Sequence, residues 1–180
     1  QVDRRTQGDR KPAELGYTLS VTGGASRARL SWSALYTRVD NLDYRTPANE
    51  EQYTIRGVGL ARSHDDYDQL TLRAATSPAP RTMLTGELTY LRQGEGSIAK
   101  RFPPINLLAD SLRFLTGTVE RTLRLAVQGT WTPVYGVNLS ADLGRHFIGN
   151  AGHVSGRSDG RGVWRVRAEI RRRLTGAFRW

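Results

Sequence analysis

The chain has 180 residues, the length of one domain, and it contains no cysteine, which excludes a disulfide framework and a thiolate metal site or nucleophile. Its net charge is +10, and 25 of its 27 basic residues are arginine. This balance favours an anionic partner such as nucleic acid, lipid phosphate or an acidic polymer, and it is equally typical of a GC-rich genome. No run approaches the roughly 18 apolar residues of a membrane helix. A mean hydropathy of −0.52 is typical of a soluble protein but does not exclude a transmembrane β-barrel, in which only alternate residues face lipid.

The first part of the chain carries no periodic pattern. Residues 1–12 are polar and charged, and we interpret them as a linker or loop that precedes one β domain over residues 13–180. The chain starts at Gln1, without a methionine or an apolar leader. We therefore expect either a processed mature chain or the C-terminal portion of a longer one.

Beyond this segment, apolar and polar residues alternate, a pattern that predicts β-strands with one apolar and one polar face. The predicted strands are residues 14–22, 27–38, 52–61, 67–77, 82–93, 117–132, 135–147 and 163–180. Glycine and proline predict tight turns at residues 23–26, 77–81 and 132–134. Longer loops are predicted at residues 39–51, 94–116 and 148–162, with a short helix near 105–115. The pattern predicts an all-β fold, an antiparallel meander of about eight strands that forms a transmembrane β-barrel or the C-terminal part of a larger one.

In a meander, successive connections lie at alternate ends of the sheet, and this alternation tests the predicted strands. If the chain terminus lies on the periplasmic side, the proline-containing turns are periplasmic and short, and the loops around them are extracellular and long, as expected for an outer-membrane barrel. The first strands break this rule. The tight turn at 23–26 becomes extracellular, and the long loop at 39–51 becomes periplasmic.

The last segment has the clearest alternation. Every second residue from Trp164 to Trp180 is uncharged except Arg172, whereas the residues between them are mostly arginine. Soluble strands typically have about five to six residues, so a segment of this length resembles the closing strand of a bacterial outer-membrane β-barrel. In those proteins the terminal aromatic residue belongs to the signal that the barrel assembly machinery reads, and the resemblance gives this role to Phe178 and Trp180. The alternative is an edge strand of a soluble sandwich.

The polar faces of the predicted strands hold more arginine than acid, and in a barrel they would point into the lumen. One interpretation is a network of arginine–carboxylate pairs, because unpaired buried charge is unfavourable. The other is a basic surface that attracts a polyanion. The candidate ligand-binding residues are Arg56, Arg73, Arg124, Arg165, Arg167 and Arg171. Aromatic residues alternate onto the opposite faces, which argues against stacking on bases and therefore against nucleic acid.

No catalytic or metal-binding constellation can be argued from the sequence. His64, His146 and His153 are too far apart for a local metal motif, and no serine or acid pairs with them at a recognisable spacing. The acidic cluster of Asp65, Asp66 and Asp68 could bind a cation or sugar hydroxyls, but we interpret it as a turn with solvated carboxylates. We therefore expect no enzymatic activity, no cofactor and no metal.

A more specific resemblance lies between residues 36 and 96. Its motifs are YTR from Tyr36, YTIRGVGL from Tyr53, DDYDQLTL from Asp65 and RQGEG from Arg92. These motifs resemble capsule-assembly outer-membrane proteins of the Wzi type, and the resemblance covers roughly residues 30–180. Members of that family are longer, with an N-terminal helical region and a larger barrel.

The resemblance implies that the chain is the C-terminal barrel portion of such a protein in the outer membrane of a Gram-negative bacterium. It also implies a non-catalytic, lectin-like role in retaining capsular polysaccharide or exopolysaccharide at the cell surface. The expected partners are an anionic polysaccharide, outer-membrane lipid and the barrel assembly machinery, with no nucleic acid.

Three other hypotheses remain open. In the first, the chain is a complete eight-stranded barrel that serves as an anchor, adhesin or narrow pore. In the second, it is a lipid-modifying outer-membrane enzyme, which would require a site that includes His146 or His153 at the end of the barrel where the loops lie. In the third, it is a soluble lipocalin-like protein, which would bury the apolar face and expose the arginines.

Overall fold

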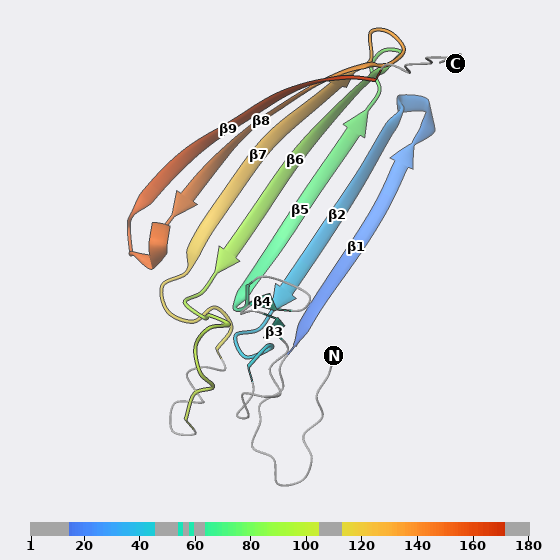
Figure 1. Ribbon diagram of the computed structural model, residues 1–180. Helices are drawn as coiled ribbons and strands as arrows, with labels where there is room; N and C mark the ends of the chain where they lie inside the picture. Colours follow the sequence, from blue (N-terminus) through green and yellow to red (C-terminus); the bar gives the residue numbers. More distant parts are fainter. Residues whose placement is uncertain (1–14, 46–53, 56–57, 60–63, 105–112, 172–180) are drawn as a thin grey trace, which may run out of the picture.

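The computed structural model describes residues 15–45, 54–55, 58–59, 64–104 and 113–171. These residues form an all-β fold built on one seven-stranded antiparallel sheet, a meander with the order β1-β2-β5-β6-β7-β8-β9 (Figure 1). Its strands are β1 (Gly16–Ala25), β2 (Leu30–Val39), β5 (Tyr67–Thr76), β6 (Thr82–Gln93), β7 (Glu120–Trp131), β8 (Val137–Gly149) and β9 (Ser158–Ile170). A separate two-stranded sheet pairs β3 (Thr54–Ile55) with β4 (Val58–Gly59). Within the described ranges, no helix is long and apolar enough to cross a bilayer.

The prediction of a third meander strand at residues 52–61 is wrong. β2 pairs directly with β5, with Tyr36 opposite Leu70, and the described residues of that segment form only the short β3 and β4. The sequence has Gly57 and Gly59 here, and glycine weakens a strand interior. The segment belongs to the long connection between β2 and β5 at one end of the sheet (Figure 1).

Removing this strand resolves the inconsistency in the predicted sidedness. The tight turns at 26–29, 77–81 and 132–136 now all lie at one end of the sheet, and the strand ends that the longer connections (40–66, 94–119 and 150–157) join lie at the other (Figure 1). We refer to the second end as the loop end. The sheet is thus the meander that the sequence predicted, with seven strands in the described part of the chain.

Several strand boundaries also differ from the predictions. The predicted second strand starts too early, because Ser26–Ala28 form a 3-10 turn closed by Arg29 at a φ of 48°. β9 begins at Ser158, inside the segment predicted as a glycine-rich loop. Its Gly160 and Gly162 lie opposite Phe147 and Arg145 of β8, and such pairing with a neighbouring strand holds glycines in extended conformation against their weak propensity. Residues 172–180 of the predicted last strand, and most of the predicted helix at 105–115, lie outside the described residues.

The register brings the apolar residues of successive strands side by side on one face of the sheet. Leu72 of β5, Leu88 of β6 and Leu125 of β7 are consecutive partners in one row, and Ala74, Gly86, Val127, Leu143 and Trp164 form the next. We call this the apolar face. Most of its large side chains are exposed, up to 76 % for Trp164. An uncovered apolar surface of this extent is exceptional for a soluble monomer.

The buried hydrophobic core lies at the loop end and not against the middle of the sheet. Val39, Tyr44, Tyr67 and Ile98 form this cluster, with Leu91 packed against it. Its residues come from the ends of β2, β5 and β6 and from the connections that follow β2 and β6. The loop end therefore has its own packed interior, whereas the apolar face of the sheet has no covering layer in the described structure.

Candidate functional site

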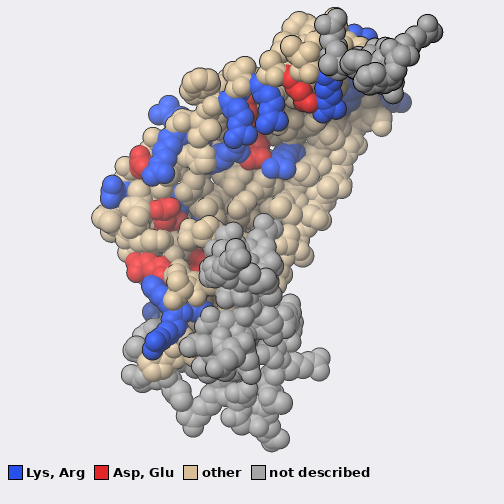
Figure 2. Space-filling model, viewed as in Figure 1, with Lys and Arg blue, Asp and Glu red and all other residues tan. Residues whose placement is uncertain are grey.

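The face opposite the apolar one, here called the charged face, carries the predicted ligand-binding arginines. Basic and acidic side chains gather over the β7–β9 half of the surface in view, which is hollowed along its middle (Figure 2). A hollow of about 340 Å³ on this face is lined by Arg73, Thr85, Glu87, Arg124, Ala126, Gln128 and Asp142. The alternation of β5, β6, β7 and β8 places these residues together, since every second side chain of a strand points to the same face.

Glu87 joins two of the predicted arginines in the centre of this hollow. Arg73 Nε donates to Glu87 Oε2 at 2.7 Å, and Arg124 Nη1 contacts Glu87 Oε1. The carboxylate is mostly buried, and Arg73 is the more exposed of the two arginines. Two cations on one carboxylate leave a local excess of one positive charge, which Asp142 at the hollow's wall offsets. Here the structure agrees with the interpretation as an arginine–carboxylate network.

β9 differs from the centre of the hollow because fewer acidic side chains lie next to its arginines. Arg165 lies directly opposite Asp142 in the ladder, and Arg167 lies opposite Ser140. Among the described residues, neither arginine makes an ion pair. Both are exposed on the outermost strand of the sheet. These two guanidinium groups can therefore accept an anion without first breaking a bond to a protein carboxylate.

The other predicted site residues are either paired locally or outside the described residues. Arg171, directly after the end of β9, donates from Nε to Glu169 Oε1 at 2.6 Å in an exposed position. Arg56, Phe178 and Trp180 lie outside the described residues. The structure thus brings Arg73 and Arg124 together, places Arg165 and Arg167 beside each other on β9, and neutralises Arg171 locally.

The histidines do not form a reactive group in the described structure. His153 Nδ1 lies 2.8 Å from the carbonyl oxygen of Thr118 and fastens the β8–β9 connection to the start of β7. His146 lies on the charged face, opposite Arg124 of β7 and Arg161 of β9. In the described ranges, no cluster of three or more histidine or acidic residues is arranged to hold a metal ion.

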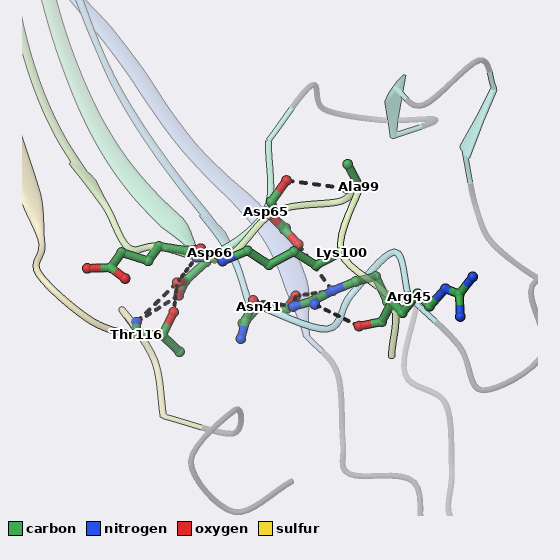
Figure 3. A network of polar contacts seen from close by, with 11 residues as sticks. Asn41, Arg45, Asp65, Asp66, Ala99, Lys100 and Thr116 are labelled. Atoms are coloured by element: carbon green, nitrogen blue, oxygen red, sulfur yellow. Dashed lines mark hydrogen bonds and ion pairs between the residues drawn. The ribbon is translucent and has the colours of Figure 1, made fainter. Parts of the chain in front are cut away.

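The acidic cluster is where the sequence interpretation fails most clearly, because its carboxylates are buried. Asp66 is 0 % exposed. Its side chain accepts hydrogen bonds from the backbone nitrogens of Gly96 at 2.9 Å and Leu115 at 3.0 Å. It also accepts from the backbone nitrogen of Thr116 at 3.0 Å and from Thr116 Oγ1 at 2.5 Å (Figure 3). Asp66 therefore clamps the two ends of the β6–β7 connection together. We call this arrangement the Asp66 clamp.

Asp65 lies beside the clamp with a different set of neighbours. It is 1 % exposed, and its Oδ2 is 3.6 Å from Arg45 Nε. That oxygen has no hydrogen-bond partner, while Arg45 donates mainly to the backbone oxygen of Asn41, at 2.6 Å from Nη2 (Figure 3). Burial raises the pKa of Asp65 to about 6, and the charge of Arg45 opposes this shift only in part.

A sequence signal for this buried cluster existed in Gly94 and Gly96. A Cβ on Gly94 would collide with the carboxylate of Asp66, and one on Gly96 would collide with Asn41 Oδ1. Glycine is required at both positions because other chain segments approach the backbone closely. The spacing alone did not identify which segments those were.

Comparison of the chain with protein-family models, with curated proteins and with solved structures gives no match.

Proposed function

We propose that the protein is a non-catalytic outer-membrane β-barrel, or part of one, that binds or helps to assemble an anionic polysaccharide at the cell surface. The observation that carries this proposal is an uncovered apolar face that runs over the seven described strands, with an opposite face that is polar on β1 and β2 and charged from β5 to β9. A lipid-facing exterior and a polar lumen require this arrangement. A lipocalin-like protein would instead turn its apolar face inward.

The order of residue types along the strands of the apolar face supports a membrane location. On β7, the apolar-face residues run from Leu123 to Trp131, and nine residues agree with the roughly 9–11 that a tilted strand needs to cross a bilayer. Towards the loop end this band gives way to an ionic row that combines Arg38, Asp68, Arg92 and Arg121. Tyr36 and Tyr90 lie in the adjoining row, which is the place of an interfacial aromatic girdle.

The number of strands supports a barrel that contains further strands. With the seven antiparallel strands of the described residues, β1 and β9 run in the same direction, so they cannot pair with each other in an antiparallel ladder. Closure of an all-antiparallel barrel requires an odd number of additional strands. This agrees with the larger barrel that the Wzi-type resemblance implies. It is also compatible with the second candidate, an eight-stranded barrel that acts as an anchor, adhesin or narrow pore, because one further strand suffices.

The anionic ligand is inferred from the charged face. Arg165 and Arg167 extend the basic surface of the lumen beyond the neutralised Glu87 network, and an extended polyanion can lie along β9. Arginine is suited to this role because its planar guanidinium group binds carboxylates in bidentate geometry. Phe178 and Trp180 retain their proposed role in recognition by the barrel assembly machinery.

The first test is whether the full chain requires a membrane environment. We expect the purified protein to need detergent to remain monodisperse and to insert into phosphatidylcholine vesicles with its strands protected from protease. A protein that is monodisperse in buffer without detergent would refute the membrane location.

The second test concerns the ligand and uses an acidic uronate polymer as the probe. We expect the double substitution Arg165→Gln and Arg167→Gln to weaken binding of the inserted protein about fivefold, because each exposed guanidinium contributes about 0.5 kcal/mol. Arg171→Gln is the matched control, since Glu169 already neutralises this residue. Equal binding by the double variant and the native protein would reject the basic lumen as the ligand site.

A further inference from the structure

Arg145 is the one charged residue within the apolar band of the described sheet. It lies on β8 between Leu143 and Phe147 on the same face, and its row partner on β7 is Leu125. The ionic row is four residues further along β8, where Gly149 lies opposite Arg121, a distance of about 13 Å along the strand. A charge at this depth is unfavourable in hydrocarbon and marks a functional position when it occurs in a membrane protein.

No protein group in the described structure neutralises this charge. Arg145 makes no ion pair there, and its guanidinium carbon lies 5.2 Å from the centre of the Phe147 ring, towards the loop end. The neighbouring strand leaves space beside it, because the partner of Arg145 on β9 is Gly162 and the partner of Phe147 is Gly160. A Cβ on Gly162 would meet no atom within 4 Å. The guanidinium group is therefore exposed, oriented by an aromatic ring and open to a ligand from the β9 side.

A shallow apolar groove begins next to Arg145. It has a volume of about 720 Å³, and Gly86 is one of its lining residues, where a Cβ would also meet no atom within 4 Å. Its apolar walls are Leu72, Ala74, Leu88, Leu125, Val127 and Leu143, with Arg145 at the rim. The groove and the guanidinium group together match a molecule with a hydrocarbon chain attached to an anion.

We infer that the apolar face binds the phosphate group of a membrane lipid at Arg145, with one acyl chain in the groove above Gly86. This inference rests on the proposed membrane location. A phosphate-bearing lipid fits better than a protein partner, because the groove is continuous with the rest of the exposed apolar band. Of its three charged lining residues, only Arg145 belongs to the apolar face, since Arg73 and Glu87 pair with each other on the charged face. Arginine binds phosphate in bidentate geometry, and a lipid-facing environment strengthens the pair by lowering the local dielectric constant.

The test inserts the full chain into phosphatidylcholine vesicles that contain phosphatidic acid, and then extracts it into mild detergent. Native mass spectrometry measures how many phosphatidic acid molecules stay bound to each protein molecule. We expect Arg145→Gln to reduce the apparent affinity about tenfold, the loss of a hydrogen bond to a charged group. Arg145→Lys should recover part of it as a point charge. Gly86→Phe, which fills the groove and keeps the charge, should weaken retention as well.

Arg165→Gln is the matched control, because it removes an arginine from the charged face and should leave lipid retention unchanged. Equal retention by Arg145→Gln and the native protein, or equal loss in Arg165→Gln, would overturn the inference. Displacement of the lipid by inorganic phosphate alone would also overturn it, since the groove would then contribute nothing. A native chain that does not insert into the vesicles would instead refute the membrane location on which the inference rests.

Discussion

The loop end and the sheet place their polar and apolar groups in opposite ways. At the loop end, the carboxylates of Asp65 and Asp66 are buried with Tyr44, Tyr67 and Ile98. In the sheet, leucine, valine and tryptophan side chains are exposed on one face, while most of the charged side chains lie on the other. The loop end is thus stabilised by its own hydrogen bonds and packing, whereas the sheet depends on what surrounds its apolar face. Substitutions in the two regions should therefore fail in different ways.

The largest expected effect is at the Asp66 clamp. Asp66→Ala leaves the partly buried backbone donors of Gly96, Leu115 and Thr116 without an acceptor, and we expect about 3–5 kcal/mol of lost protection at the loop end. Hydrogen exchange of residues 113–118 measures this loss. Asp159→Asn, at an exposed carboxylate of β9, is the control and should change exchange little. Unchanged protection in Asp66→Ala would show that the clamp does not hold the connection.

The next largest effect tests the apolar face of the sheet. Leu125→Arg places a second charge in the apolar band, and membrane insertion should become less favourable by about 2–4 kcal/mol. Gln128→Arg, on the other face of the same strand, is the matched control and should insert normally. Folding and insertion yields in phosphatidylcholine vesicles give the comparison. Higher solubility of Leu125→Arg in buffer, with the fold intact, would instead indicate a face that water covers.

A smaller effect is expected at Gly96, where side chains of the loop end lie close to the backbone. Gly96→Ala introduces a Cβ against Asn41 and the side chain of Asp66, and overpacking of this kind costs about 1–3 kcal/mol. Gly129→Ala, on β7, is the control because its Cβ would meet no atom within 4 Å. Thermal unfolding of both variants should separate them. Equal melting temperatures would mean that the loop end adjusts to the added methyl group without cost.

The smallest expected effect is a pH dependence that is confined to the loop end. The folded-state pKa of Asp65 is about 6, above its unfolded value of 3.8, so the native state binds more protons between these values. Stability contributed by this group therefore falls as the pH rises from about 4 to about 6, by about 1–2 kcal/mol. Hydrogen exchange near Asp65 across this range measures the change. Asp65→Asn should abolish it, and a dependence that persists in this variant would assign the titration to another group.

Much of the sheet could be predicted because strand periodicity is a local property. The apolar positions Leu84, Leu88 and Tyr90 of β6 follow from alternation alone, and the observed strand covers the predicted residues 82–93. Where glycine interrupts the pattern, as in Gly160 and Gly162, the prediction failed. Pairing with β8 holds those two glycines extended. Their partners on β8 are more than ten residues away in the sequence, so local alternation does not reveal them.

The candidate site was predictable as a set of residue types on one face but not as a set of pairs. Alternation placed Arg73, Arg124, Arg165 and Arg167 on the charged face. It could not show that Glu87 pairs with Arg73 and Arg124. Nor could it show that Arg165 and Arg167 have no ion pair in the described structure. Those pairings depend on the registers of four strands, which side-chain alternation constrains only to steps of two residues.

The sequence by itself determined that the chain forms amphipathic strands with an arginine-rich face, because each strand's faces are written in consecutive residues. Only the tertiary structure decided that β2 pairs with β5 and that all tight turns lie at one end, since the choice of partner is a contact between distant segments. The same reason applies to Asp66. Its neighbours in sequence suggest a solvated turn, but residues 30 to 50 positions away supply its hydrogen bonds and remove it from water.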